Sequence, residues 1–313
     1  MARNSRKLRH DIAYIIFSAA IFIIKKTPRF LGLRLFGFLG FLFGHILKKE
    51  REITKKNLKS VFENYSQKQI NRITNGVFVN AGKSFFDGIR IPEYSKEKFF
   101  KIVRLENENL TKEIFSNPNG TIILGSHLSA FELKTHIAAK LGFKGMSIGS
   151  RLFDKRIDKI FVNLRERNGV KYYERNGGMK NVLKNLKNGF NFGVLVDQDA
   201  TNNGIFVNFL GKEAFTPSAP IKIAARYKIP LAWSFLIREN NDKYLFYIER
   251  AEIIETENET ESFILNLEKF NDKLGEFIKK YPEQWVWMHR RWKREAKDFP
   301  PQLSISYYKE KEK

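Results

Sequence analysis

A histidine and an acid with the spacing of a catalytic pair follow an apolar run in the middle of the chain. His127 lies two residues after the run 121–125, and Glu132 lies five positions further on. If the carboxylate of Glu132 accepts the proton of one imidazole nitrogen, the other nitrogen can take a proton from a substrate hydroxyl. No enzyme nucleophile is then required, and the chain has no cysteine to supply a thiol.

The spacing also has interpretations that involve no chemistry. His45 and Glu50 show it as well, but that histidine closes an apolar segment and the acid lies in a charged run, so we treat this second match as coincidental. Ser129 and Glu132 fit a capping box, in which the serine caps a helix and the glutamate bonds back to the serine amide. The sequence leaves both the capping box and the catalytic pair open.

Two further carboxylates, Asp197 and Asp199, follow the apolar run 191–196. An acidic pair after a strand can hold a divalent metal, as in nucleotide-sugar glycosyltransferases. Such a short pattern more often caps a turn or pairs with nearby arginines, so we expect no metal here.

Arginines are spaced along the segment between the histidine and these acids. Their planar guanidinium groups suit bidentate contacts to phosphate, although a solvated helix face would explain any single one. The series comprises Arg151, Arg165, Arg167 and Arg175.

The overall composition indicates a folded protein with anionic partners. Of the 313 residues 42% are hydrophobic, which argues against wholesale disorder, and 56 Lys and Arg against 34 Asp and Glu give a net charge of +22. Nucleic acid, an anionic membrane, phosphorylated lipids and an acidic carrier protein all fit this charge. The segment 282–293 places three of the four tryptophans beside basic residues and suits an interface, a nucleic-acid platform or a core with cation–π contacts.

The elements that position these residues alternate between strands and helices. Short apolar runs predict strands at 121–125, 192–196, 231–237 and 244–248. Helical periodicity appears from Ile70 to about residue 90 and near 128–141, 155–167, 178–188, 216–228 and 262–280. This order predicts an α/β fold with a mostly parallel central sheet flanked by helices, with ligands at the carboxyl ends of the strands.

The first 50 residues differ from the rest and suggest a membrane anchor. Residues 12–24 carry no charge, a second apolar stretch covers 30–47, and basic residues flank and divide the two. Thirteen helical residues reach only about 20 Å, short of the ~30 Å hydrocarbon core. We favour an interfacial or re-entrant anchor over a tilted span or buried core helices. The predicted domains are therefore an anchor at 1–50 and an α/β domain at 51–313.

Together these features resemble the lysophospholipid acyltransferase superfamily, in its bacterial lipid A late (lauroyl/myristoyl) acyltransferase branch. The likeness covers nearly the whole chain. The matching features are the apolar anchor, the H-x4-(D/E) signature at His127 and Glu132, Arg151, the segment 164–169, Asp197 and Asp199 leading to Gly204 and Phe206, Thr216, and the ending 282–293.

The resemblance implies a membrane-bound enzyme on the cytoplasmic face of the bacterial inner membrane. Such an enzyme transfers a fatty acyl chain from acyl-(acyl carrier protein), or from acyl-CoA, to a hydroxyl of a phosphorylated lipid A precursor. It uses no cofactor, no metal and no covalent acyl-enzyme, and its partners are acidic carrier protein, glycolipid acceptor and membrane lipids, not nucleic acid. His127 and Glu132 would form the general-base pair. The implied substrate-binding residues are Arg151, Arg165, Arg167, Asp197, Asp199, Gly204 and Phe206.

Three alternatives remain at the level of sequence. An acyltransferase of the same fold could act on a lysophospholipid or another glycolipid. A membrane-associated nucleic-acid-binding protein would use the basic charge and the tryptophan-rich ending, and its binding would survive loss of His127. A glycosyltransferase would need Asp197, Asp199 and a divalent ion, so full activity in EDTA would reject it.

Overall fold

A seven-stranded sheet forms the centre of the computed structural model, which describes residues 2–152, 154–175, 177–199 and 203–311. The strand order is β1-β9-β8-β2-β5-β3-β4, and β2, β3, β4, β5 and β8 run parallel while β1 and β9 run the opposite way. The strands are β1 (Val103–Leu105), β2 (Ile122–Gly125), β3 (Gly145–Gly149), β4 (Lys171–Glu174), β5 (Asn191–Leu195), β8 (Leu231–Arg238) and β9 (Tyr244–Ala251). The predicted fold class is confirmed.

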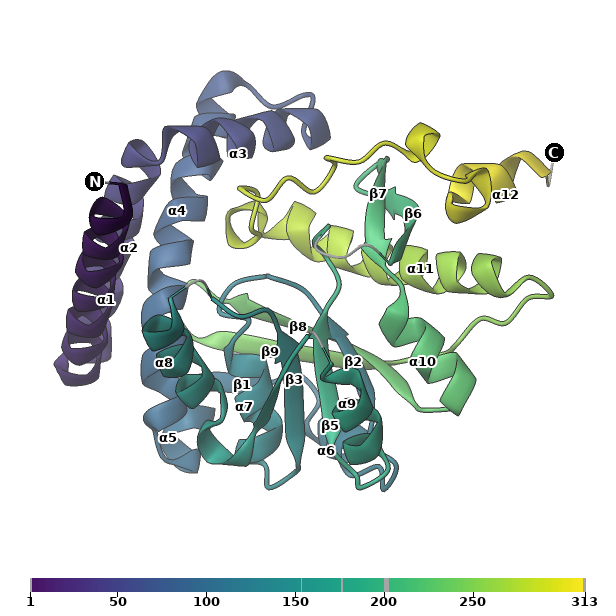
Figure 1. The fold of residues 1–313 in the computed structure, drawn as a ribbon, viewed down its shortest axis with the longest axis horizontal. Helices are drawn as coiled ribbons and strands as arrows, with labels where there is room; N and C mark the ends of the chain where they lie inside the picture. Colours follow the sequence, from purple (N-terminus) through teal and green to yellow (C-terminus); the bar gives the residue numbers. More distant parts are fainter. Residues whose placement is uncertain (1, 153, 176, 200–202, 312–313) are drawn as a thin grey trace.

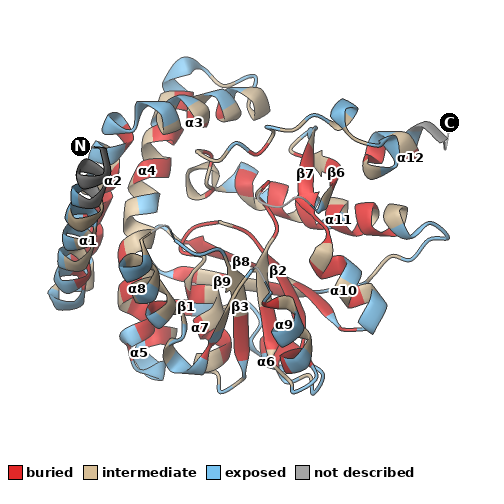
Figure 2. Cartoon of the chain, viewed as in Figure 1, coloured by how far each residue is buried: buried red, intermediate tan, exposed pale blue. Residues whose placement is uncertain are grey.

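Helices cover both faces of this sheet (Figure 1). One core cluster joins the sheet to α9 (Met179–Leu186), α10 (Ala219–Tyr227) and α11 (Glu259–Lys280). The other joins it to α5 (Lys96–Phe100), α6 (Glu108–Phe115) and α7 (Leu133–Lys140). Figure 2 shows the strands as mostly buried and the outer sides of the helices as exposed. Burial on both faces explains why the central strands read as continuous apolar runs.

A helical layer lies along one side of this core (Figure 1). The helices α1 (Ala2–Lys26) and α2 (Arg29–Ile46) form a hairpin beside α4 (Gln67–Arg90), with α3 (Lys48–Val61) at one end. Close approach between α2 and α4 depends on glycine, because a Cβ on Gly40 would lie 2.2 Å from the carbonyl oxygen of Phe78. The domain boundary expected at residue 50 lies inside α3.

A buried carboxylate fixes this layer to the sheet. Asp87 of α4 is fully buried. It accepts hydrogen bonds from Arg29 of α2 at 2.8 and 2.9 Å, from Arg238 of β8 at 2.9 Å and from the Tyr244 hydroxyl of β9 at 2.7 Å. A buried charge needs such partners, so the four groups hold α2, α4 and the sheet in one arrangement.

Several local predictions differ from the structure. The helix expected from residue 128 begins at Leu133, because Ser129 adopts a left-handed φ of 52° and residues 126–132 form a loop. The helix expected from residue 216 begins at Ala219, because the preceding residues belong to an antiparallel hairpin of β6 (Gly204–Phe209) and β7 (Lys212–Pro217). Neither this hairpin nor β1, β3 and β4 was predicted, since their apolar runs are short or interrupted by polar residues.

The chain returns to the sheet edge after α11. Residues 282–294, which we call the C-terminal strap, run from the end of α11 past the β6–β7 hairpin toward α12 (Ile305–Lys311), as Figure 1 shows. An isolated antiparallel bridge joins Leu128 to Trp285 of the strap. The remaining helix, α8 (Lys155–Arg165), lies between the α1–α2 hairpin and the sheet and contacts both α1 and β4.

Candidate active site

His127 and Asp197 form a hydrogen-bonded pair at the carboxyl edge of the sheet. Gly125 of β2 pairs with Leu195 of β5, so the residues two positions beyond each strand emerge side by side. The Nδ1 atom of His127 lies 2.7 Å from Oδ1 of Asp197, although the residues are 70 positions apart. This placement is typical of functional groups in open α/β sheets.

The aspartate of this pair is ionised. Burial would raise the pKa of Asp197, but the opposing charge of His127 and hydrogen bonds from His127 and Trp285 lower it to about 2. The carboxylate is therefore ionised and can accept the Nδ1 proton of His127; in the neutral imidazole this tautomer carries the lone pair on Nε2. An imidazole in this tautomer can act as a general base.

Glu132 does not take the place that the sequence suggested. Its carboxylate accepts two hydrogen bonds from Arg165 of α8, at 2.6 and 3.0 Å, whereas His127 bonds to Asp197. The expected His127–Glu132 hydrogen bond is thus replaced, because strand register brings Asp197 to Nδ1 and Glu132 faces α8 instead. The capping box is also absent from this described loop, since α7 begins after Glu132 and the buried hydroxyl of Ser129 has no hydrogen-bond partner there.

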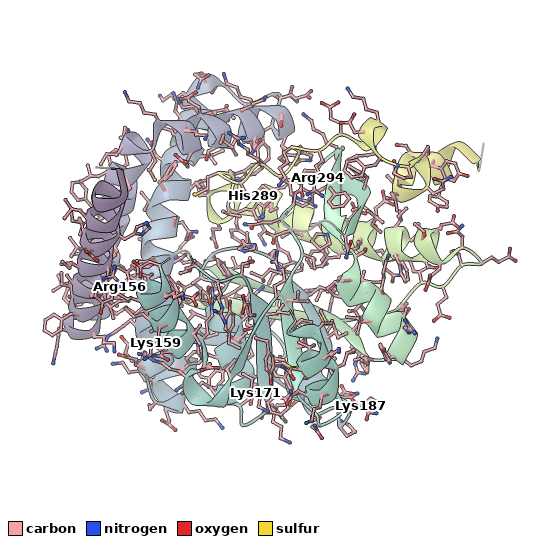
Figure 3. The ribbon with its side chains drawn as sticks, viewed as in Figure 1. Arg156, Lys159, Lys171, Lys187, His289 and Arg294 are labelled. Carbon is pink, nitrogen blue, oxygen red and sulfur yellow. The ribbon has the colours of Figure 1, made fainter. Side chains whose placement is uncertain are left out.

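Buried charges continue behind the pair. Asp199 is 1% exposed and forms ion pairs with Lys293 at 3.7 Å and Arg294 at 3.3 Å, both in the C-terminal strap. Figure 3 shows Arg294 and His289 on this segment above the sheet. Arg291 is fully buried and donates to the hydroxyl of Thr216 at 2.6 Å. Among the described residues, no group of three or more potential metal ligands comes together.

A cavity of about 330 Å³ opens beside His127 and extends between α7 and the sheet. Its lining includes the partly exposed side chains of His127, Glu132 and Arg165 and the buried rings of Phe115 and Phe246. Three strand glycines line it and let α7 lie close to the sheet: a Cβ on Gly125 would meet Lys134, one on Gly145 would meet Thr135 and Ala138, and one on Gly193 would meet Thr135. The walls are mostly apolar, as in pockets that bind hydrophobic ligands.

One lysine lies beneath the histidine loop. Lys134 lines the cavity, and its Nζ donates to the carbonyl oxygens of Ser126 at 3.2 Å and Ser234 at 3.4 Å. Burial lowers the pKa of Lys134 to about 8, although the charge of Asp197 opposes the shift. The ammonium group thereby connects the loop before His127 to strand β8.

The other predicted substrate-binding residues lie outside the described cavity wall. Arg151 is exposed and pairs with Glu174, and Arg167 pairs with Glu93 at 2.8 Å. Gly204 pairs with Pro217 in the β6–β7 hairpin, and Phe206 is fully buried against Phe215 and Phe299. Of the four arginines in the predicted series, Arg165 and Arg175 line the cavity together with His127.

Sequence reasoning missed two parts of the site. The indole Nε1 of Trp285 donates to Oδ2 of Asp197 at 2.8 Å, and the backbone N–H of His127 donates to the same oxygen at 2.8 Å. The strand glycines that line the cavity were also overlooked. A tryptophan in a basic segment gives no indication of its hydrogen-bond acceptor, whereas Gly125 and Gly193, inside predicted strands, indicate that a neighbouring element approaches the sheet closely.

Comparison with known proteins connects this site to an activity. Residues 1–294 match the model of the family described as bacterial lipid A biosynthesis acyltransferase. The chain belongs to this family. It is 24% identical over 273 residues to a lipid A biosynthesis acyltransferase of Haemophilus influenzae, covering 86% of this chain and 83% of that protein. It is 22% identical over 257 residues to a lipid A biosynthesis myristoyltransferase of Escherichia coli K12, covering 80% and 77%.

The family inferred from the motifs is therefore confirmed. A lipid A biosynthesis acyltransferase is an enzyme that takes an acyl group from a donor and places it on a glycolipid acceptor. Family membership favours acyl transfer over the nucleic-acid-binding and glycosyltransferase alternatives. One helix, Arg29–Ile46, has the length and apolar composition of a membrane span among the described residues, with a mean hydropathy of 1.3.

Proposed function

We propose that the protein transfers a fatty acyl chain from acyl-(acyl carrier protein), or from acyl-CoA, to a hydroxyl of a phosphorylated lipid A precursor. It would act at the cytoplasmic face of the bacterial inner membrane, without a cofactor or metal. The observation that carries the proposal is the His127–Asp197 pair, whose histidine lines a mostly apolar cavity, in a chain of the lipid A acyltransferase family.

The chemistry follows from the tautomer of His127. Nε2 takes the proton of the acceptor hydroxyl as its oxygen attacks the thioester carbonyl, and Asp197 stabilises the imidazolium that forms. The tetrahedral intermediate then collapses, the carbon–sulfur bond breaks, and Nε2 returns the proton to the departing thiolate. The acyl group passes directly to the acceptor, so no residue of the enzyme is acylated.

Arg165 is placed to act on charge in this reaction. Its guanidinium lines the cavity together with His127 and is held by two hydrogen bonds to Glu132. Burial would lower the pKa of Arg165, but the hydrogen bonds and charge of Glu132 raise it, so the group stays cationic. From this position Arg165 can donate to the oxyanion or to a phosphate of the acceptor.

The cavity suits the acyl chain. Its lining combines apolar side chains, including the buried rings of Phe115 and Phe246, with the small residues Gly193 and Ser147. Burial of methylene groups there would stabilise binding by about 0.8 kcal/mol for each group. An alkyl chain lying in the cavity would leave its thioester beside His127.

The α1–α2 hairpin supports attachment to a membrane. Among the described residues, large exposed hydrophobic side chains concentrate on this hairpin and the residue after it. They are Leu8, Ile12, Ile15, Ile16, Phe22, Ile23, Phe30, Leu31, Leu35, Phe38, Leu42, Phe43, Ile46 and Leu47. Such an apolar face is unfavourable in water and favourable in the interfacial region of a bilayer, where nearby lysines meet anionic headgroups. We therefore propose residues 1–50 as the anchor of the α/β domain.

An acyl-transfer assay with purified protein tests the proposal. Acyl-(acyl carrier protein) and a phosphorylated lipid A precursor are incubated with enzyme in detergent, and mass spectrometry follows the acylated product. Wild type and His45→Ala should form product, whereas His127→Ala should lose activity by a factor of about 10⁴. Full activity of His127→Ala would overturn the mechanism.

The acceptor needs its own measurement. Lipids of a deletion strain are compared with those of the parent by mass spectrometry, and the lipid A of the deletion strain should lack one acyl chain. Loss of an acyl chain from a phospholipid or another glycolipid, with lipid A unchanged, would show that the acceptor is a different lipid.

A further inference from the structure

The C-terminal strap touches the catalytic pair through one side chain. Trp285 is 1% exposed, and its Nε1 donates to Oδ2 of Asp197 at 2.8 Å. The backbone N–H of His127 donates to the same oxygen, while Nδ1 of His127 occupies Oδ1. Three donors therefore fix the two carboxylate oxygens of Asp197. Two of them belong to His127, and the third is the indole N–H of Trp285.

The backbone around Trp285 is tied to the histidine loop. Leu128 and Trp285 form an antiparallel bridge, and the N–H of Ser129 donates to the carbonyl oxygen of Gln284 at 2.7 Å. The Gln284 side chain in turn exchanges two hydrogen bonds of 2.8 Å with the backbone of Arg238 at the end of β8. The strap, the loop and the sheet edge thus form one hydrogen-bonded unit.

Aromatic packing holds the indole ring in place. The ring of Trp285 is enclosed by Phe209 of β6, which it meets edge to face at 5.3 Å, and by Trp287 at 4.9 Å, while the ring of Trp292 lies further away at 6.3 Å. A ring enclosed in this way has little freedom to move away from Asp197, so its N–H is an oriented donor.

We propose that Trp285 is a positioning residue of the acyl-transfer reaction, whose indole N–H holds Asp197 in the rotamer that aligns His127 for proton transfer. This inference rests on the proposed function, in which His127 is the general base. The strap is then a part of the catalytic apparatus and not only a cover for the core. Removing the N–H leaves one buried carboxylate oxygen with a single donor and loosens the Nδ1 hydrogen bond.

Trp285→Phe tests the proposal, with Trp292→Phe as the matched control. Trp292 lies in the same strap and stacks on Phe209, but among the described residues its buried Nε1 has no hydrogen-bond acceptor. We expect kcat of Trp285→Phe to fall about ten- to a hundredfold, because a hydrogen bond to a buried charge is lost, with KM for both substrates unchanged. Trp292→Phe should retain the wild-type kcat.

The pH profile separates positioning from a general structural effect. Without the Trp285 donor, Asp197 keeps more negative charge beside the imidazole and the His127–Asp197 pair takes up a proton more readily. The acidic limb of kcat/KM therefore moves to higher pH in Trp285→Phe and stays in place in Trp292→Phe. The other charged groups facing the pair are Lys134 of α7, Asp199, and Arg291 and His289 of the strap. Burial lowers the pKa of His289 to about 4, and all four groups are the same in both variants.

A substrate-free measurement keeps this inference distinct from the proposed function. The Nδ1 proton of His127 should give a downfield NMR resonance in wild type and in Trp292→Phe, and this resonance should broaden or move upfield in Trp285→Phe. If wild type fails to acylate lipid A precursors, the proposed function fails while this measurement still stands.

The proposal is overturned if Trp285→Phe keeps the wild-type kcat, pH profile and Nδ1 resonance, or if Trp292→Phe shows the same losses. Should Trp285→Phe fail to fold, benzothienylalanine at position 285 keeps the ring shape and replaces the N–H by sulfur. The same losses are expected of it, and wild-type behaviour would equally reject the role of the N–H.

Discussion

Two regions of the molecule are unusual in opposite ways. The carboxyl edge of the sheet around His127 and Asp197, which we call the catalytic edge, buries charged groups, and the α1–α2 hairpin exposes apolar ones. The catalytic edge buries Asp197, Asp199 and Arg291, whereas the hairpin exposes large apolar side chains such as Phe38 and Ile46. Each arrangement is costly in water. The buried charges are compensated by hydrogen bonds and by opposite charges, while the exposed apolar face requires a surrounding medium other than water, which we propose to be lipid.

The two regions are connected by buried polar groups. Asp87 joins α2 to α4 and the sheet, and Asn57 of α3 donates to the backbone of the C-terminal strap at Trp287 and His289, at 2.8 and 3.0 Å. The layer of α1 to α4 is therefore fixed relative to the strap that contacts Asp197. Because the two regions have different tasks in the proposed function, we expect substitutions at the catalytic edge to change acyl transfer but not liposome binding, and substitutions on the hairpin to do the reverse.

The largest effect is expected at the catalytic edge. Asp197→Asn should lower kcat by a factor of about 10⁴, because an amide can donate to Nδ1 and move the imidazole proton to Nε2. Sedimentation with liposomes should be unchanged. Steady-state acyl-transfer assays measure kcat, and activity within tenfold of wild type would mean that Asp197 does not orient the base.

The next effect is on stability where the two regions meet. Asp87→Asn leaves Arg29 and Arg238 without their buried anion and should lower the free energy of unfolding by about 3 kcal/mol. Thermal unfolding in detergent measures this loss, with activity per folded molecule retained. Glu52→Gln, which breaks an exposed pair with Lys55, is the control and should change stability by less than about 0.5 kcal/mol. Equal shifts in both variants would contradict the anchoring role of Asp87.

Glu132 gives a smaller catalytic effect than Asp197. Glu132→Gln weakens the pair with Arg165, which is 25% exposed, and should lower kcat/KM about ten- to a hundredfold while His127 keeps its hydrogen bond to Asp197. Acyl-transfer kinetics of the two variants are compared directly. A loss in Glu132→Gln as large as that in Asp197→Asn would show that Glu132 orients His127 in the working enzyme.

The smallest effect is expected on the hairpin. Phe38 is 59% exposed, and Phe38→Ser should weaken partition into anionic liposomes about tenfold because the apolar ring no longer enters the interface. Tyr227→Ser, which removes an exposed aromatic ring from α10, should leave partition unchanged. Activity on detergent-dispersed substrates should match wild type in both. Unchanged partition of Phe38→Ser would place the membrane contact elsewhere.

Much of this protein is determined by local sequence. The apolar runs before His127 and Asp197, the helical periodicity between them and the apolar first 50 residues follow from side-chain patterns within short windows. These patterns predicted the α/β class, placed four of the strands and brought His127 to a strand end. Each depends only on neighbours in the chain, which is why sequence alone is sufficient.

The tertiary structure decided which acid serves the histidine. Strand β5 pairs with β2 although β3 and β4 intervene in the chain, so Asp197 meets His127 across 70 residues and Glu132, five residues away, meets Arg165. The contact with Trp285 depends on a still longer return of the chain. Spacing along a sequence carries no record of strand order or of loop direction, and these two features determine which buried charges and donors come within hydrogen-bond distance.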